Sequence, residues 1–175
     1  MRLFIAIELP KEIIEELSRL QKELKQDGLR LVKAFHLTLK FLGEVPDPKL
    51  EALKEGLSMI KFKSFDAELS EIGVFPDYDH IRVIWAGVKA DQLYSLQKEI
   101  ELSTERLGFL REKDFKPHLT LARVNFLKDK EALKNKLNSL KINNTKFKVE
   151  DFRLIKSTLT PTGPIYEVLG LFKLG

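Results

Sequence analysis

Apolar residues along the chain follow two periodicities, one typical of strands and one typical of helices. Residues 2–9 are apolar at nearly every position, which predicts a strand that is buried on both faces. Pro10 then opens a helix, as proline favours the first helical turn. The apolar stripe of this helix falls at Ile13, Ile14, Leu17, Leu20 and Leu24. An extended stretch over 29–42 follows, and glycine and proline residues end it.

The same order of elements then occurs a second time. The first half ends with a helix over 50–57 and a strand over 65–72. The second half has a strand over 82–88, a helix over 93–107, another extended segment, a helix over 133–140 and a strand over about 146–157. The shared order predicts an internal pseudo-repeat of about 1–75 and 80–158, with a closing strand at about 165–172. No flexible linker separates the copies, so we expect residues 1–175 to form a single bilobal domain.

Each copy contains the tetrapeptide HLTL, at residues 36–39 and again at residues 118–121. These copies use two of the three histidines in the chain. Residues two apart on a strand point to the same face, so each motif would present an imidazole and a hydroxyl together. A matched pair of such motifs predicts the two halves of one site.

Two imidazoles on opposite sides of a phosphorus atom can act as an acid–base pair. One would remove a proton from the attacking oxygen while the other protonates the leaving oxygen. We therefore predict that His36 and His118 are catalytic. Thr38 and Thr120 would donate hydrogen bonds to the non-bridging oxygens, where transition-state charge accumulates. Lys40 continues the face of the first motif and is predicted to contact phosphate.

Other side chains near the motifs are weaker candidates. Lys116 and Arg123 could contact phosphate, although strict strand alternation would turn Arg123 away from the second histidine, so its role requires a bend in the strand. Phe75 and Tyr78 could stack on a base, and Phe75 could equally cap the core. His80 lies in a loop with no threonine partner, and we expect a surface residue.

Composition limits the remaining classes of function. The chain has no cysteine, which excludes thiolate catalysis and thiolate metal sites and fits a reducing compartment. Its net charge of +4 allows a polyanionic partner.

No apolar run is long enough to span a membrane and no targeting segment is visible, so we expect a cytoplasmic protein. Two histidines are too few for a usual zinc site, and no metal site is predicted. The high charged fraction of 32% hints at a heat-adapted source.

The paired motifs resemble the two-histidine (2H) phosphoesterase superfamily, and specifically its LigT-like branch of RNA 2′,3′-cyclic phosphodiesterases, also called 2′-5′ RNA ligases. Five segments carry the resemblance: RLFIA at 2–6, FHLTLKFLG at 35–43, GVFP at 73–76, RVIW at 82–85 and PHLTLAR at 117–123. The resemblance implies an α+β fold of two pseudo-symmetric lobes, with antiparallel sheets lining a central cleft and helices outside.

The resemblance also implies an activity and residue roles. The reaction would be hydrolysis of an RNA 2′,3′-cyclic phosphate to a 2′-phosphomonoester, with no metal and no cofactor. His36 would be the general acid and His118 the general base. Thr38 and Thr120 would hold the phosphate, and Arg123 matches the substrate-binding arginine of the family.

Three alternatives remain open at this stage. The same groups could catalyse reversible 2′-5′ ligation of RNA halves, since a reaction and its reverse share one transition state. They could hydrolyse a small cyclic nucleotide phosphate such as ADP-ribose cyclic phosphate. A non-catalytic module that binds RNA ends is the third, although arginine and lysine would serve binding alone better than imidazoles. We expect a monomer, because two lobes that complete one site need no second chain.

Overall fold

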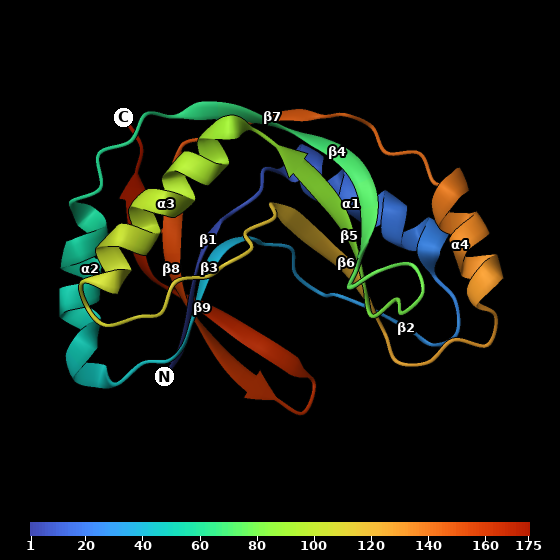
Figure 1. Ribbon diagram of the computed structural model, residues 1–175, viewed down its shortest axis with the longest axis horizontal. Coiled ribbons are helices and arrows are strands. Elements are labelled where there is room, and N and C mark those ends of the chain that lie inside the picture. Colours follow the sequence, from blue (N-terminus) through green and yellow to red (C-terminus); the bar gives the residue numbers. More distant parts are fainter.

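Two antiparallel sheets face each other across the centre of the protein in the computed structural model, which describes residues 1–175 (Figure 1). The first sheet has four strands in the order β3-β1-β8-β9. Its strands are β1 (Arg2–Ile7), β3 (Leu37–Glu44), β8 (Asp151–Thr160) and β9 (Gly163–Lys173). The β8–β9 hairpin extends beyond its sheet into the space between the lobes (Figure 1).

The second sheet has five strands in the order β2-β6-β5-β4-β7. Its strands are β2 (Leu29–Leu31), β4 (Phe65–Phe75), β5 (Val83–Lys89), β6 (His118–Val124) and β7 (Lys146–Val149). Every pairing in both sheets is antiparallel. The α+β class with antiparallel sheets and helices outside is therefore confirmed.

Four α-helices cover the outer faces of the sheets. They are α1 (Lys11–Leu24), α2 (Leu50–Ser58), α3 (Asp91–Glu105) and α4 (Lys130–Ser139), and a short 3₁₀ turn, η1 (Asp47–Lys49), precedes α2. Helices α2 and α3 lie outside the first sheet, whereas α1 and α4 lie outside the second (Figure 1). The side chain of Asp129 caps α4 by accepting a hydrogen bond from the backbone N–H of Ala132 at 2.9 Å.

The chain crosses between the two lobes several times. Strand β1 belongs to the first sheet, but α1 packs near β6 of the second sheet. Strand β5 belongs to the second sheet, but α3 packs near β3 of the first sheet. The fourth strand of each half crosses too, since β4 pairs with β5 and β8 pairs with β1. Each lobe is therefore built from both halves of the sequence.

The inner faces of the helices and the outward faces of the sheets form one continuous core of 35 buried apolar residues. On α1, Leu17, Leu20 and Leu24 are fully buried, as their spacing predicts. Ile14 is 41% exposed, so its placement in the buried stripe was wrong. Ile14 directly follows the fully buried Ile13, and successive helical positions differ by about 100° in direction.

One predicted strand is in fact two strands. The segment 146–157 was expected to be continuous, but it breaks at Glu150 into β7 and β8, which belong to different sheets. The expected closing strand is present as β9, which pairs with β8 in a hairpin. None of the helices is long and apolar enough to cross a membrane.

Candidate active site

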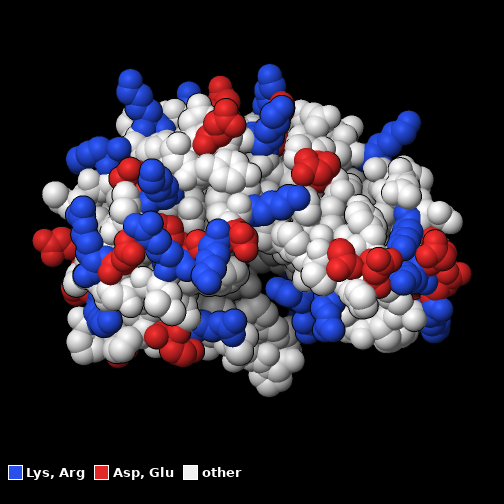
Figure 2. Space-filling view, in the orientation of Figure 1, with Lys and Arg blue, Asp and Glu red and all other residues white.

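A cavity of about 670 Å³ opens between the two sheets, and Figure 2 shows the hollow with basic side chains at its edge. Strands β1, β3, β8 and β9 line it from the first sheet, and β2 and β6 line it from the second. Strands β3 and β6, which carry the two motifs, approach each other within 8 Å between Cα atoms. The two halves of the predicted site are therefore brought to one place.

The first motif lies on the wall of this cavity. His36 immediately precedes β3, and both His36 and Thr38 line the cavity. The imidazole of His36 meets two aromatic rings edge-on, with ring centroids 4.7 Å away at Tyr166 and 5.6 Å away at Phe4. Burial lowers the pKa of His36 below its ordinary value, and the carboxylate of Glu8 acts in the opposite direction.

The second motif begins β6. Thr120 lines the cavity, whereas His118 flanks it two residues away on the same face of the strand. The Nδ1 atom of His118 lies 2.7 Å from the carbonyl oxygen of Lys116. A carbonyl only accepts hydrogen bonds, so Nδ1 carries the proton and Nε2 of the neutral ring is an acceptor. This orientation leaves Nε2 as a base.

The electrostatic surroundings of His118 differ from those of His36. Burial is the main cause that lowers the pKa of His118. The positive charges of Lys116 and Arg123 lower it further, while the Lys116 carbonyl and the carboxylate of Glu112 raise it. The charge that acts on His36 is thus negative, and cations help to keep His118 neutral.

Aromatic side chains support the second imidazole. Phe75 lies edge-on to His118 with ring centroids 4.9 Å apart, and Trp85 lies next to both. Gly73 pairs with Trp85 across β4 and β5, and a Cβ at Gly73 would lie 2.2 Å from the indole ring. The ammonium of Lys116 lies over that indole, 4.4 Å from the ring centroid. Gly73 therefore leaves space for the indole ring of Trp85, which lies next to His118.

Lys40 does not face the cavity, and its predicted contact with phosphate is wrong. The register of β1 and β3 shifts, so that Ile5 pairs with Lys40 while Ala6 pairs with Thr38, leaving Leu39 as an extra residue. This β-bulge turns Lys40 to the opposite face of β3. There its side chain is fully buried and forms a 2.7 Å ion pair with Glu101 of α3.

The corresponding bulge in β6 has the opposite consequence for Arg123. Ile84 pairs with Ala122 and Trp85 pairs with Thr120, so Leu121 is the extra residue. The bulge returns Arg123 to the face of Thr120, where it lines the cavity. This is the bend that a role for Arg123 required.

The remaining candidates lie outside the cavity. Phe75 packs against Trp85 and His118, and Tyr78 is exposed in the loop before β5; neither lines the cavity. His80 is exposed, as predicted, with its Nδ1 3.4 Å from the carboxylate of Asp77. No group of three or more histidine, cysteine, aspartate or glutamate side chains is placed to hold a metal ion.

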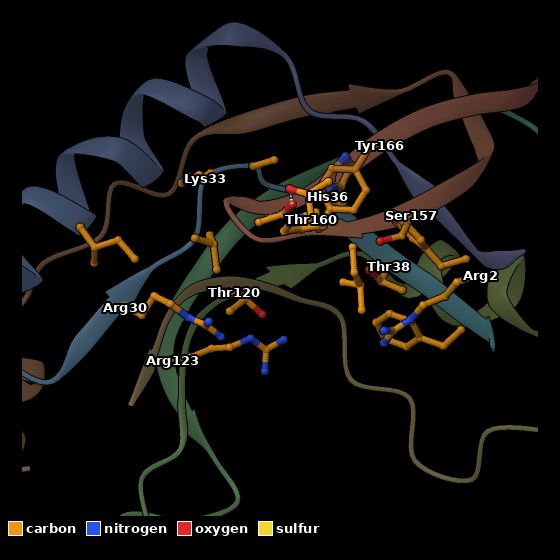
Figure 3. A pocket seen from close by; sticks show the side chains of 18 of the residues that line it. Arg2, Arg30, Lys33, His36, Thr38, Thr120, Arg123, Ser157, Thr160 and Tyr166 are labelled. Atoms are coloured by element: carbon orange, nitrogen blue, oxygen red, sulfur yellow. Dashed lines mark hydrogen bonds between the residues drawn. The ribbon is translucent and has the colours of Figure 1, made fainter. Parts of the chain in front are cut away.

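Several cavity residues were missed by sequence reasoning. Figure 3 shows Arg2, Arg30, Lys33 and Tyr166 around the two motif threonines. No aspartate or glutamate is among the lining residues, so the cavity wall is cationic. Arg30 and Lys33 reach it because β2 pairs with β6, and Tyr166 because the β8–β9 hairpin folds over the cavity. No local pattern in the sequence indicates either arrangement.

Known proteins resemble this chain over nearly its whole length. The profile of the family described as "LigT like Phosphoesterase" matches residues 7–85 and again residues 87–166. A Methanocaldococcus jannaschii protein named RNA 2′,3′-cyclic phosphodiesterase is 43% identical over 173 residues, which cover 97% of this chain and 98% of that protein.

Solved structures give the same result. The crystal structure of TT0787 from Thermus thermophilus aligns with a TM-score of 0.84 at 31% identity, covering 99% of this chain and 98% of that one. The crystal structure of E. coli LigT complexed with 3′-AMP aligns with a TM-score of 0.81 at 28% identity, covering 99% of this chain and 97% of the other. The chain therefore belongs to the LigT-like phosphoesterase family.

Proposed function

We propose that this protein is an RNA 2′,3′-cyclic phosphodiesterase that opens the cyclic phosphate at an RNA 3′ end and leaves a 2′-phosphomonoester. The observation that carries the proposal is that His36, Thr38 and Thr120 line one cationic cavity, with His118 two residues from Thr120 on the same face of β6. The name of the M. jannaschii relative, which is similar over nearly its full length, supports the same reaction.

The surroundings of the two histidines support distinct roles. With its Nδ1 proton held by the Lys116 carbonyl, His118 presents an unprotonated Nε2 that can accept a proton from water. The water oxygen then attacks phosphorus as the bond to O3′ breaks. His36, beside the negative charge of Glu8, donates a proton to O3′. The bound phosphate adds further negative charge near His36 and favours its protonated form.

The cavity wall supplies the electrostatic part of catalysis. Thr38 and Thr120 project from the two sheets toward the cavity and can donate hydrogen bonds to the non-bridging oxygens. Arg123 shares the face of Thr120 and contributes to the positive potential of the cavity, which attracts an anionic substrate. No covalent intermediate is needed.

The organisation of the chain supports three further proposals. A single chain supplies both motifs and the whole cavity wall, which fits a monomer. Residues 1–175 act as one bilobal unit with an internal pseudo-repeat, since each lobe draws strands from both halves. The absence of cysteine from the sequence fits a cytoplasmic location.

Hydrolysis of a defined RNA end tests the proposal. An oligoribonucleotide with a 2′,3′-cyclic phosphate is incubated with the protein in the presence of EDTA, and the product is identified by ³¹P NMR. We expect a 2′-phosphomonoester at a rate that EDTA does not change. ADP-ribose cyclic phosphate and paired RNA halves are assayed in parallel to test the two alternative reactions. A 3′-phosphomonoester, or no hydrolysis of the RNA end, would contradict the proposal.

A further inference from the structure

Two arginines lie directly opposite each other on the wall of the cavity that belongs to the second sheet. Arg30 of β2 pairs with Arg123 of β6 in the antiparallel register, so their Cβ atoms are about 5 Å apart. Like charges placed directly across a strand pair are destabilising. Figure 3 shows both guanidinium groups extending into the cavity beside Thr120. Such a pair becomes favourable when an anion lies between the two groups.

The protein does not neutralise these charges itself. Arg19, Arg111 and Arg153 each form an ion pair with a carboxylate elsewhere in the structure. Arg30 and Arg123 instead face a cavity whose lining contains neither aspartate nor glutamate. Their positive charge is directed toward the space that a ligand would fill.

Lys33 adds a third positive charge to the cavity wall and also contacts the β8–β9 hairpin. Its ammonium donates a 2.7 Å hydrogen bond to the carbonyl oxygen of Thr162 in the turn between β8 and β9. An ammonium has three N–H donors, so two remain for a ligand. The segment between β2 and β3 is thereby held against the tip of the hairpin at the cavity.

This cluster lies apart from the place where the reaction occurs. Thr120 and Arg123 are three residues apart on β6, or about 10 Å along an extended strand, and Arg30 lies one strand further out. A phosphate between the two motif threonines therefore leaves the Arg30 side of the cavity free for a second anionic group. Arginine side chains suit that group, since a guanidinium can bind phosphate through two parallel hydrogen bonds.

We propose that Arg30, Arg123 and Lys33 form a second phosphate subsite, which binds the 5′-phosphate of the nucleotide that carries the reacting cyclic phosphate. In an RNA chain this is the phosphodiester that joins the terminal nucleotide to the preceding one. The inference rests on the proposed function. It predicts that a substrate with a second phosphate, one nucleoside away from the first, is favoured over a simple nucleoside cyclic phosphate.

Substrates that differ by one phosphate test this subsite. The value of kcat/KM is measured for adenosine 2′,3′-cyclic phosphate, for its 5′-phosphorylated form, for a dinucleotide with the same end and for ADP-ribose cyclic phosphate. We expect the three substrates with additional phosphate to be favoured by about tenfold or more. The Arg30→Gln variant should reduce this preference at least about fivefold. Preference for the dinucleotide over ADP-ribose cyclic phosphate identifies an RNA phosphodiester as the natural occupant.

A matched arginine controls for a general loss of charge. Arg106 is exposed at the end of α3 and does not line the cavity, so Arg106→Gln should leave the preference unchanged. Equal wild-type activity on adenosine 2′,3′-cyclic phosphate and on its 5′-phosphorylated form would overturn the inference. So would an Arg30→Gln variant that loses the same factor on every substrate.

A binding measurement separates the subsite from the reaction. Adenosine 2′,5′-bisphosphate and adenosine 2′-monophosphate are titrated by calorimetry against the wild-type protein and Arg30→Gln. We expect the bisphosphate to bind about tenfold more tightly to the wild type, and most of that difference to disappear in the variant. Equal affinities would refute the subsite even if the RNA end is hydrolysed. A tenfold difference would support it even if no hydrolysis occurs.

Discussion

The charged neighbours of the two imidazoles distinguish their roles. Glu8 opposes the effect of burial on the pKa of His36, whereas Lys116 and Arg123 add to the effect of burial on His118. The active form of the free enzyme has a protonated His36 and a neutral His118. Because burial lowers both pKa values below 6.5, this form is most populated at mildly acidic pH. As the pH rises, activity is lost with the proton of His36, and as the pH falls, activity is lost when His118 becomes protonated.

The pH dependence of kcat/KM tests this assignment. We expect a bell-shaped profile with its maximum on the acid side of pH 6.5, because kcat/KM reports the pKa values of the free enzyme. Glu8→Gln removes the charge that raises the pKa of His36, so the descending basic limb should move to lower pH. The acidic limb should stay in place. Movement of the acidic limb in this variant would show that the two roles are reversed.

The threonine hydroxyls have a separate effect on rate. Removing one preorganised donor to transition-state charge typically costs about 10²–10³ in kcat. We expect Thr38→Val and Thr120→Val each to lower kcat by roughly that factor while KM changes little. Thr158→Val is the matched control, because Thr158 lies on β8 but does not line the cavity. A change confined to KM would contradict a transition-state role.

At the scale of single elements, strand alternation placed the motifs correctly but not their neighbours. The rule that residues two apart share a face accounts for His36 with Thr38 and for His118 with Thr120. It fails one step further along each strand, because a bulge follows each threonine. A bulge depends on the pairing of two strands that are distant in sequence, so the sequence of one strand does not reveal it. The buried position of Lys40 could not be predicted for that reason.

The buried ion pair links the first motif strand to a helix and to the segment that leads into β6. Lys40 donates to Glu101 and to the carbonyl oxygen of Leu110, each at 2.7 Å. Glu101 also accepts a 2.9 Å hydrogen bond from Gln97. The pair therefore connects β3, just after its bulge, to α3 and to the segment that precedes the second motif.

Removing one partner of this pair should be costly. Lys40→Ala leaves the Glu101 carboxylate buried without its cation, and we expect the free energy of unfolding to fall by about 3–5 kcal/mol in urea titrations. The Lys40→Met, Glu101→Leu double variant removes both charges and should lose clearly less than the sum of the losses in the Lys40→Met and Glu101→Leu single variants. Additive losses would show that the two side chains do not depend on each other.

At the scale of the whole molecule, the chain crosses repeatedly between two lobes. Local periodicity predicted the helices and most strands, because an amphipathic pattern depends only on neighbouring residues. It could not predict which sheet a strand joins. The segment 146–157 shows this limit, since its two parts lie in different sheets. The cationic wall of the cavity was missed for the same reason, since Arg30 reaches it only through the long-range pairing of β2 with β6.

The crossing of the chain predicts that neither half folds alone. Fragments 1–79 and 80–175 meet at the exposed loop before β5, and each lacks strands that its sheets require. We expect each fragment alone to be largely unfolded by circular dichroism. Mixing the two should restore a buried environment for Trp85, which is 3% exposed and the only tryptophan. A shift in its fluorescence reports this change. A cooperatively folded isolated fragment would contradict the account.

The central claim is that His36 and His118 together catalyse the opening of a 2′,3′-cyclic phosphate. Its most direct test is kcat/KM on an oligoribonucleotide with that end for His36→Asn and His118→Asn. The control is His80→Asn, which alters the exposed loop histidine. The account predicts that each motif variant loses about 10²–10⁴-fold, as expected for one general acid or base, while the control keeps wild-type activity. Wild-type activity in either motif variant would contradict it.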